Sequence, residues 1–99
     1  MTTIGILGAA GRMGRSLINA GLAAGAGIAG GTERPGSAAI GIDLGTLAGK
    51  EPIGVVVTDD AAALFAAADV VIDFTAPVAA PSHATLAAKS GKALVIGTT

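Results

Sequence analysis

The sequence feature that most constrains the fold is a glycine-spaced turn between an apolar run and a segment of helical periodicity. Gly8, Gly11 and Gly14 follow the apolar residues 3–7 in the pattern G-x-x-G-x-x-G. In a strand–turn–helix unit, the first glycine permits the turn, the second lets the backbone approach a pyrophosphate, and the third allows helix–strand packing. The amide groups and the dipole at the helix start favour an anion. The motif predicts nucleotide binding, with a purely structural turn as the alternative.

Hydrophobic periodicity divides the rest of the chain into alternating strands and helices. We expect strands at residues 3–7, 28–32, 53–58, 70–74 and 93–96. Helices are expected from Gly11 or Arg12 to about Ala24, from Asp59 or Asp60 to Ala68, and from Pro77 or Pro81 to Ser90. Residues 35–52 are expected to form a long loop with one helical turn near 44–48, either a functional segment or a plain connector.

This alternation predicts an α/β fold with helices on both faces of a parallel sheet. Right-handed crossovers and the glycine turn after the first strand favour the strand order 3-2-1-4-5, a Rossmann-type doubly wound parallel sheet. We interpret residues 1–99 as the N-terminal part of such a dinucleotide-binding domain, incomplete at its C-terminal edge. Apolar Leu94 and Ile96 of the last strand are then expected to meet water or another chain.

The composition limits which side chains can form the core and which kinds of partner the chain can bind. Only two Phe and no Trp or Tyr occur among 52% hydrophobic residues, so the core must consist of small aliphatic side chains. On the first helix we expect Met13, Leu17, Ile18, Gly21 and Leu22 to share the core-facing side.

A net charge of −1 provides no electrostatic attraction for nucleic acid or an anionic membrane, and the absence of cysteine excludes thiolate metal sites. No apolar run approaches the roughly 20 residues of a membrane span. We expect a cytoplasmic protein without a metal site.

Four segments are expected to meet at the carboxyl edge of the sheet, where ligands bind in this architecture. They are Gly8–Gly14, Glu33–Arg34, Asp73–Thr75 and Gly97–Thr99. Glu33 occupies the place of the acid that binds the adenosine ribose. Arg34 is suited to bind a 2′-phosphate or to stack on adenine, and a solvated turn is the alternative for both residues.

Other polar residues are assigned smaller roles. Arg12 opposes the helix dipole unless an anion binds there, so it is a candidate phosphate partner, whereas Arg15 is expected to face solvent. Asp73 is expected to tie loop amides rather than to catalyse. His83 has no partner at metal-ligand spacing and is expected on the surface. No residue of this chain is a strong candidate for a general acid.

Together these residues resemble dihydrodipicolinate reductase (4-hydroxy-tetrahydrodipicolinate reductase), the oxidoreductase of lysine and diaminopimelate biosynthesis. The resemblance rests on the "GRMGR", "DFT" and "GTT" motifs and on Glu33–Arg34, in this order and spacing, from end to end of the chain. It implies NADPH and NADH as cofactors. The pyrophosphate would be held by Gly8, Ala9, Ala10, Gly11, Arg12 and Met13, the ribose by Glu33, and the phosphate of NADPH by Arg34.

By the same resemblance, the nicotinamide site would be lined by Phe74, Thr75, Gly97, Thr98 and Thr99. Thr99 would also face the substrate, a cyclic imine dicarboxylate. The family continues into a second domain that binds and protonates the substrate and through which the parent enzyme forms a homotetramer. That domain is absent from this sequence, so we expect no catalytic residue and no turnover in this chain. Ala76 stands where the family often has a basic residue.

Two other interpretations stay open. The first is another oxidoreductase with the same glycine spacing, such as a semialdehyde or homoserine dehydrogenase. These enzymes need a nucleophilic cysteine or a different catalytic lysine, and this chain has no cysteine. The second is a non-enzymatic nucleotide-binding module, such as a redox sensor or a coenzyme A-binding domain.

Overall fold

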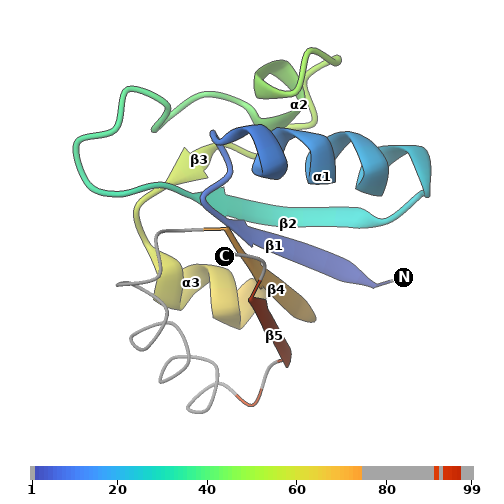
Figure 1. The fold of residues 1–99 in the computed structure, drawn as a ribbon, viewed down its shortest axis with the longest axis vertical. Coiled ribbons are helices and arrows are strands. Elements are labelled where there is room, and N and C mark those ends of the chain that lie inside the picture. Colours follow the sequence, from blue (N-terminus) through green and yellow to red (C-terminus); the bar gives the residue numbers. More distant parts are fainter. Residues whose placement is uncertain (1, 75–90, 92, 97–99) are drawn as a thin grey trace.

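A single parallel sheet forms the centre of the molecule (Figure 1). The computed structural model describes residues 2–74, 91 and 93–96. The strands are β1 (Thr3–Leu7), β2 (Gly27–Thr32), β3 (Val57–Thr58), β4 (Val70–Asp73) and β5 (Ala93–Ile96), and the helices are α1 (Arg12–Ala23), α2 (Leu44–Leu47) and α3 (Ala61–Ala67). The strand order β3-β2-β1-β4-β5 confirms the predicted topology.

Neighbouring residues of β1 point to opposite faces of the sheet, and each face has its own core. Ile6 packs with Ile18 of α1 and Leu44 of α2. Leu7 packs with Leu64 and Phe65 of α3 on the other face. Figure 1 shows the resulting three layers, with α1 and α2 on one side of the sheet and α3 on the other. The prediction of helices on both faces is therefore confirmed.

Small residues in the strands let α3 approach the sheet closely. A Cβ atom on Gly5 would lie 2.7 Å from Cδ1 of Leu64, and one on Gly30 would lie 2.9 Å from the same atom. A Cβ at either position would force Leu64 to shift, so the two glycines leave the space that Leu64 fills. The scarcity of large side chains is thus matched by a short distance between helix and sheet.

The third strand is much shorter than predicted, because β3 contains only Val57 and Thr58 instead of residues 53–58. Backbone groups of the preceding residues bond to the region of α2 rather than to β2. The amide of Leu44 donates to the carbonyl of Val55, and Val56 forms an antiparallel bridge with Asp43. Hydrogen bonds to the long loop therefore replace the sheet ladder that the valine run predicted.

The boundaries of α1 are confirmed, but one of its core assignments is wrong. Gly14, Ile18 and Gly21 are the buried residues, and Leu17 and Leu22 are half-buried against them. Met13 is 59% exposed, because it precedes this stripe by one residue, about 100° around the helix. Ala24 caps the helix, and Gly25 follows with φ of +78°, a conformation that favours glycine.

The last strand lies at one edge of the described sheet. Leu94 is half-buried and packs against the core on the α3 side, whereas Val95 is 51% exposed. The side chain of Ile96, the expected helix that ends near Ser90, and His83 lie outside the described residues. Within the described part of the chain, no helix is long and apolar enough to cross a membrane.

Candidate functional site

The glycine turn connects β1 to α1 and is anchored to the end of β2. The amides of Gly8 and Ala9 both donate to the carbonyl oxygen of Thr32, at 2.9 and 3.2 Å. The amide of Gly11 donates to the carbonyl of Gly8 at 3.2 Å and closes the turn. Gly8 has φ of +83°, so this position requires the conformational freedom of glycine. The turn is therefore formed by hydrogen bonds within the protein.

The other two glycines of the motif differ in what surrounds them. A Cβ on Gly14 would collide with the Gly8 carbonyl oxygen and would lie 2.7 Å from the Ala9 carbonyl oxygen. Gly14 is therefore required for α1 to pack on the turn. A Cβ on Gly11 would meet only the Gly8 oxygen, at an ordinary 3.5 Å, and the backbone of Gly11 is extended with φ of −70°. Nothing within the fold requires glycine at this position.

The start of α1 exposes its first amide groups at this turn. The first hydrogen bond within the helix runs from the amide of Arg15 to the carbonyl of Gly11, at 3.0 Å. Gly11 offers no side chain to cap the amides of the first turn, which follow it, and that turn holds no acidic residue. Arg12 is exposed at the same end. This combination of amide groups, a positive dipole end and a guanidinium is suited to an anionic ligand.

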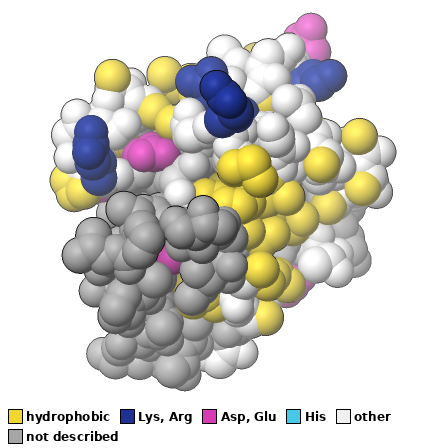
Figure 2. All heavy atoms as spheres, viewed as in Figure 1, with side chains coloured by type: hydrophobic (Ala, Val, Ile, Leu, Met, Phe, Trp, Pro, Cys, Tyr) yellow, Lys and Arg dark blue, Asp and Glu magenta, His cyan; other side chains and the backbone are white. Residues whose placement is uncertain are grey.

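Of the two residues that follow β2, Glu33 is bonded to the glycine turn and Arg34 is exposed to solvent. The Glu33 carboxylate accepts a hydrogen bond from the amide of Ala10, with Oε2 2.8 Å from the nitrogen. The Glu33 backbone amide donates to the Thr58 carbonyl at 2.9 Å, which fixes the residue at the end of β2. Arg34 is exposed beside it. Figure 2 shows basic side chains gathered over this region with an acidic side chain between them. The structure thus brings Glu33 onto the glycine turn.

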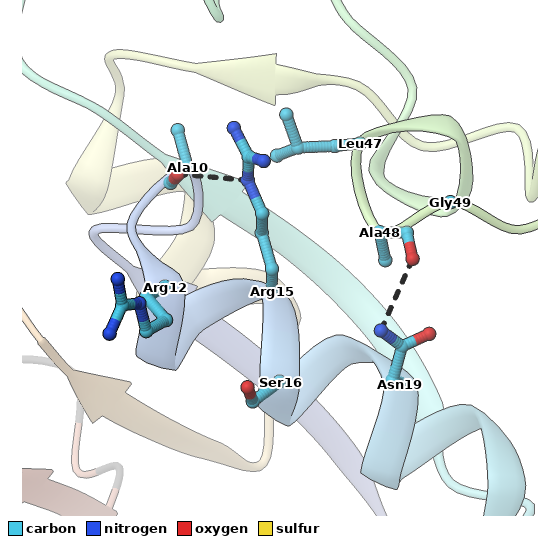
Figure 3. Close-up of a pocket in the computed structure, with 8 residues that line it drawn as sticks. All are labelled: Ala10, Arg12, Arg15, Ser16, Asn19, Leu47, Ala48 and Gly49. Atoms are coloured by element: carbon cyan, nitrogen blue, oxygen red, sulfur yellow. Dashed lines mark hydrogen bonds between the residues drawn. The ribbon is translucent and has the colours of Figure 1, made fainter.

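A groove of about 620 Å³ runs between α1 and α2 beside the turn (Figure 3). It is lined by Ala10, Arg12, Arg15, Ser16, Asn19, Leu47, Ala48 and Gly49. Asn19 Nδ2 donates to the Ala48 carbonyl at 3.1 Å and joins the two walls. Asn19 Oδ1 is buried and has no hydrogen-bond partner among the described residues.

Arg15 is exposed, as predicted, but its side chain is also held by the protein. Its Nε donates to the Ala10 carbonyl oxygen at 3.0 Å. Figure 3 shows its guanidinium group between Ala10 and Leu47, whereas Arg12 extends away from α2. The sequence does not reveal this contact, because it depends on how α1 leaves the turn.

The carboxyl ends of the central strands meet in register at the turn. Leu7 pairs with Thr32 of β2 and with Asp73 of β4, and Asp73 pairs with Ile96 of β5. Asp73 is fully buried there. The amide of Phe74 donates to the Leu7 carbonyl at 2.8 Å, so Phe74 lies beside the glycine turn.

The remaining predicted site residues, Thr75, Gly97, Thr98 and Thr99, lie outside the described residues. Among the residues that the structure does describe, no group of three or more His, Cys, Asp or Glu side chains is placed to hold a metal ion.

Asp43 organises the long loop, and sequence reasoning missed it. Its carboxylate accepts hydrogen bonds from the amides of Gly45, Ile53 and Gly54 at 2.8, 2.9 and 2.7 Å, and from Thr46 at 3.4 Å. These bonds, led by that from Ile53, lower the pKa of the Asp43 carboxyl, although burial acts in the opposite direction. Asp43 thereby fixes α2, which forms one wall of the groove. An acid directly before the helical turn was the available signal.

Comparison with known proteins adds to this geometry. A family profile described as "Dihydrodipicolinate reductase, N-terminus" matches residues 2–99. A 4-hydroxy-tetrahydrodipicolinate reductase of Anaeromyxobacter dehalogenans is 53% identical over 100% of this chain and 37% of its own length. Proteins with the same name from Chromohalobacter salexigens and Acinetobacter baumannii are 52% and 51% identical over 37% and 35% of their lengths. The chain thus spans little more than a third of these relatives.

One solved structure has a similar fold. It is the UDP-N-acetylglucosamine 3-dehydrogenase GnnA from Acidithiobacillus ferrooxidans, with a TM-score of 0.69 and 21% sequence identity. The match covers 96% of this chain and 29% of that structure. At this identity the likeness concerns the fold alone, and it agrees with the Rossmann-type sheet described above.

Proposed function

This chain belongs to the family of dihydrodipicolinate reductase N-terminal domains, and we propose that it binds NADPH and NADH as the N-terminal part of a dinucleotide-binding domain. The reductase would convert 4-hydroxy-tetrahydrodipicolinate to tetrahydrodipicolinate. The bound cofactor supplies the hydride for this reduction, while the protein orients it. The substrate, a cyclic imine dicarboxylate, and a homotetrameric assembly belong to this proposal for the whole reductase.

The observation that carries the proposal is the environment of Gly11. Gly8 and Gly14 are required by the backbone conformation and by packing, but Gly11 is exposed and has room for a Cβ. Neither backbone conformation nor packing within the protein requires glycine at position 11. A ligand that lies against the backbone at this position would explain why no side chain is present. The amides of the first turn of α1 are directed to the same place, and they suit the pyrophosphate of a dinucleotide.

The end of β2 would hold the adenosine part of the cofactor. The Ala10 amide fixes Oε2 of Glu33, which leaves Oε1 to accept a hydrogen bond from a ribose hydroxyl. Arg34, exposed next to it, offers a guanidinium to the 2′-phosphate of NADPH. An acid alone would repel that phosphate, and the adjacent cation offsets the repulsion, so we expect both cofactors to bind.

At the other end of the cofactor, Phe74 is the described residue that we assign to the nicotinamide site. Its backbone bond to Leu7 keeps it next to the glycine turn. Thr75, Gly97, Thr98 and Thr99 are assigned to the same site, and Thr99 also to the substrate. We assign no proton donor within this chain, because no described residue in the site combines an acidic proton with access to a substrate. This chain would therefore orient the cofactor without catalysing the reduction.

Calorimetric titration of the chain with NADPH, NADH and coenzyme A tests the proposal. We expect both nicotinamide cofactors to bind and coenzyme A not to bind. Binding of coenzyme A alone would support the non-enzymatic nucleotide-binding module instead. A second assay follows NADPH oxidation with freshly made 4-hydroxy-tetrahydrodipicolinate, and we expect no turnover by this chain. Turnover within about tenfold of a full-length reductase, roughly 1.4 kcal/mol in barrier, would contradict the assignment of the proton donor outside it.

A further inference from the structure

We propose that the groove between α1 and α2 is an anion subsite in which Arg15, together with Arg34, binds the 2′-phosphate of NADPH. This inference rests on the proposed function, because it concerns the adenosine end of the same cofactor. It assigns to Arg15 a role in cofactor choice.

The first support is the way in which Arg15 is held. Its Nε–H group donates to the Ala10 carbonyl at 3.0 Å, so the guanidinium is turned back toward the glycine turn, as Figure 3 shows. Within the described residues, this is the one hydrogen bond that the Arg15 side chain makes to the protein. An arginine has five N–H donors, and the terminal nitrogens form the fork that binds phosphate in a bidentate manner. Arg15 is therefore positioned by one donor, which leaves that fork for a ligand.

The second support is that the backbone of one residue, Ala10, positions both Arg15 and Glu33. The Ala10 amide donates to Oε2 of Glu33 at 2.8 Å, and the Ala10 carbonyl accepts from Arg15 at 3.0 Å. A ribose that bonds to Glu33 would carry its 2′ substituent close to this residue. A phosphate there has a charge of about −1.5 to −2 and would be repelled by the Glu33 carboxylate. Arg15, fixed beside Ala10, supplies a compensating positive charge.

The third support is the shape and charge of the surroundings. The groove is open beside the turn, and Arg12 and Ser16 of α1 are among its lining residues. The bond from Asn19 to the Ala48 carbonyl holds α2 against α1, so the groove is preformed. No acidic residue lines it. Such a lining is selective for an anion small enough to enter between two helices.

The experiment measures the dissociation constants of NADPH and NADH for the chain and for Arg15→Ala. We expect Arg15→Ala to weaken NADPH roughly tenfold or more, as for loss of a charge-assisted hydrogen bond, and to change NADH by less than about twofold, because NADH lacks the contacted group. Arg15→Gln removes the charge but keeps a side-chain amide that can donate to Ala10, so its effect should also be confined to NADPH. Lys50→Ala is the matched control, since it removes an exposed positive charge from the loop after α2 and should leave the ratio of the two constants unchanged.

Two further ligands identify the source of the anion. Adenosine 2′-monophosphate should bind more weakly to Arg15→Ala than to the parent chain, and inorganic phosphate alone should show no measurable difference. Binding of inorganic phosphate that depends on Arg15 as strongly as NADPH does would show a free phosphate site and overturn the assignment. An unchanged NADPH to NADH ratio in both Arg15 variants would overturn this inference while leaving the proposed function intact. Failure of the parent chain to bind either cofactor would overturn both.

Discussion

Replacement of Gly14 by alanine should destabilise the chain although it adds only one methyl group. The new Cβ would collide with the Gly8 carbonyl oxygen and would lie 2.7 and 2.8 Å from the carbonyl oxygen and carbon of Ala9. All three atoms belong to the backbone of a turn that two hydrogen bonds fix to Thr32. The turn cannot move away from α1 without loss of these bonds.

The expected magnitude follows from two opposing effects. Overpacking in a rigid environment costs about 1–3 kcal/mol, and rigid backbone neighbours place this site at the upper end. Alanine is favoured over glycine within a helix by about 1 kcal/mol, which offsets part of that cost. The net loss in unfolding free energy is then about 2 kcal/mol, and the melting temperature should fall by roughly 8–16 °C in a chain of this size.

Thermal unfolding followed by circular dichroism measures this difference, and Gly11→Ala is the matched control. The same substitution at Gly11 places its Cβ at an ordinary 3.5 Å from one oxygen atom, so its melting temperature should stay close to that of the parent chain. Equal melting temperatures for Gly14→Ala and the parent chain would refute the packing explanation. Equal losses in the two variants would show that both glycines serve the same purpose.

Three further predictions concern the core, the long loop and cofactor choice. Leu64→Ala should lower the unfolding free energy measured in urea by about 2–5 kcal/mol. Adding Gly30→Ala should destabilise this variant less than it destabilises the parent chain, because the Leu64 atom that a Cβ on Gly30 would meet is then absent. Additive effects of the two substitutions would contradict that contact. The folded-state pKa of Asp43 is lowered, so its stabilising contribution is present at neutral pH and is lost as the pH falls below 3.8 toward the folded-state value. Asp43→Asn should flatten this part of the profile of unfolding free energy against pH. An unchanged profile would show that the carboxylate does not hold the loop. Arg34→Ala should weaken NADPH more than NADH by about 1–3 kcal/mol in titration calorimetry, as for a charge-assisted hydrogen bond; equal weakening would show that Arg34 does not contact the phosphate.

The sequence predicts those parts of the fold that local periodicity determines. The boundaries of β1 and α1, an acidic cap of α3 at Asp59 or Asp60, and the strand order all follow from short-range patterns and general handedness rules. The valine run before Thr58 predicted a strand over residues 53–58, but only Val57 and Thr58 form one. A strand also needs a neighbouring strand to which its backbone can bond. Here the loop around Asp43 uses the groups that would have bonded to β2.

The candidate site was predictable to a similar extent. The position of Glu33 at the end of β2 follows from the spacing of the motif, and the structure adds its bond to the Ala10 amide. The exposure of Met13 and the bond of Arg15 to Ala10 depend on the rotation of α1 relative to the turn. No pattern of residue types encodes that rotation, because it results from the packing of Gly14 against the Gly8 and Ala9 carbonyls.

Calorimetric titration of NADPH into the chain and into its Gly11→Val variant tests most directly whether the glycine turn holds the nucleotide. Gly11 is exposed and has an extended backbone that valine can adopt, so the variant should keep its fold, as a parallel melting curve would confirm. Its branched side chain would occupy the space assigned to the pyrophosphate. We expect NADPH to bind to the parent chain and binding to the variant to be almost abolished. Equal affinity for NADPH in a folded Gly11→Val variant would contradict nucleotide binding at this turn.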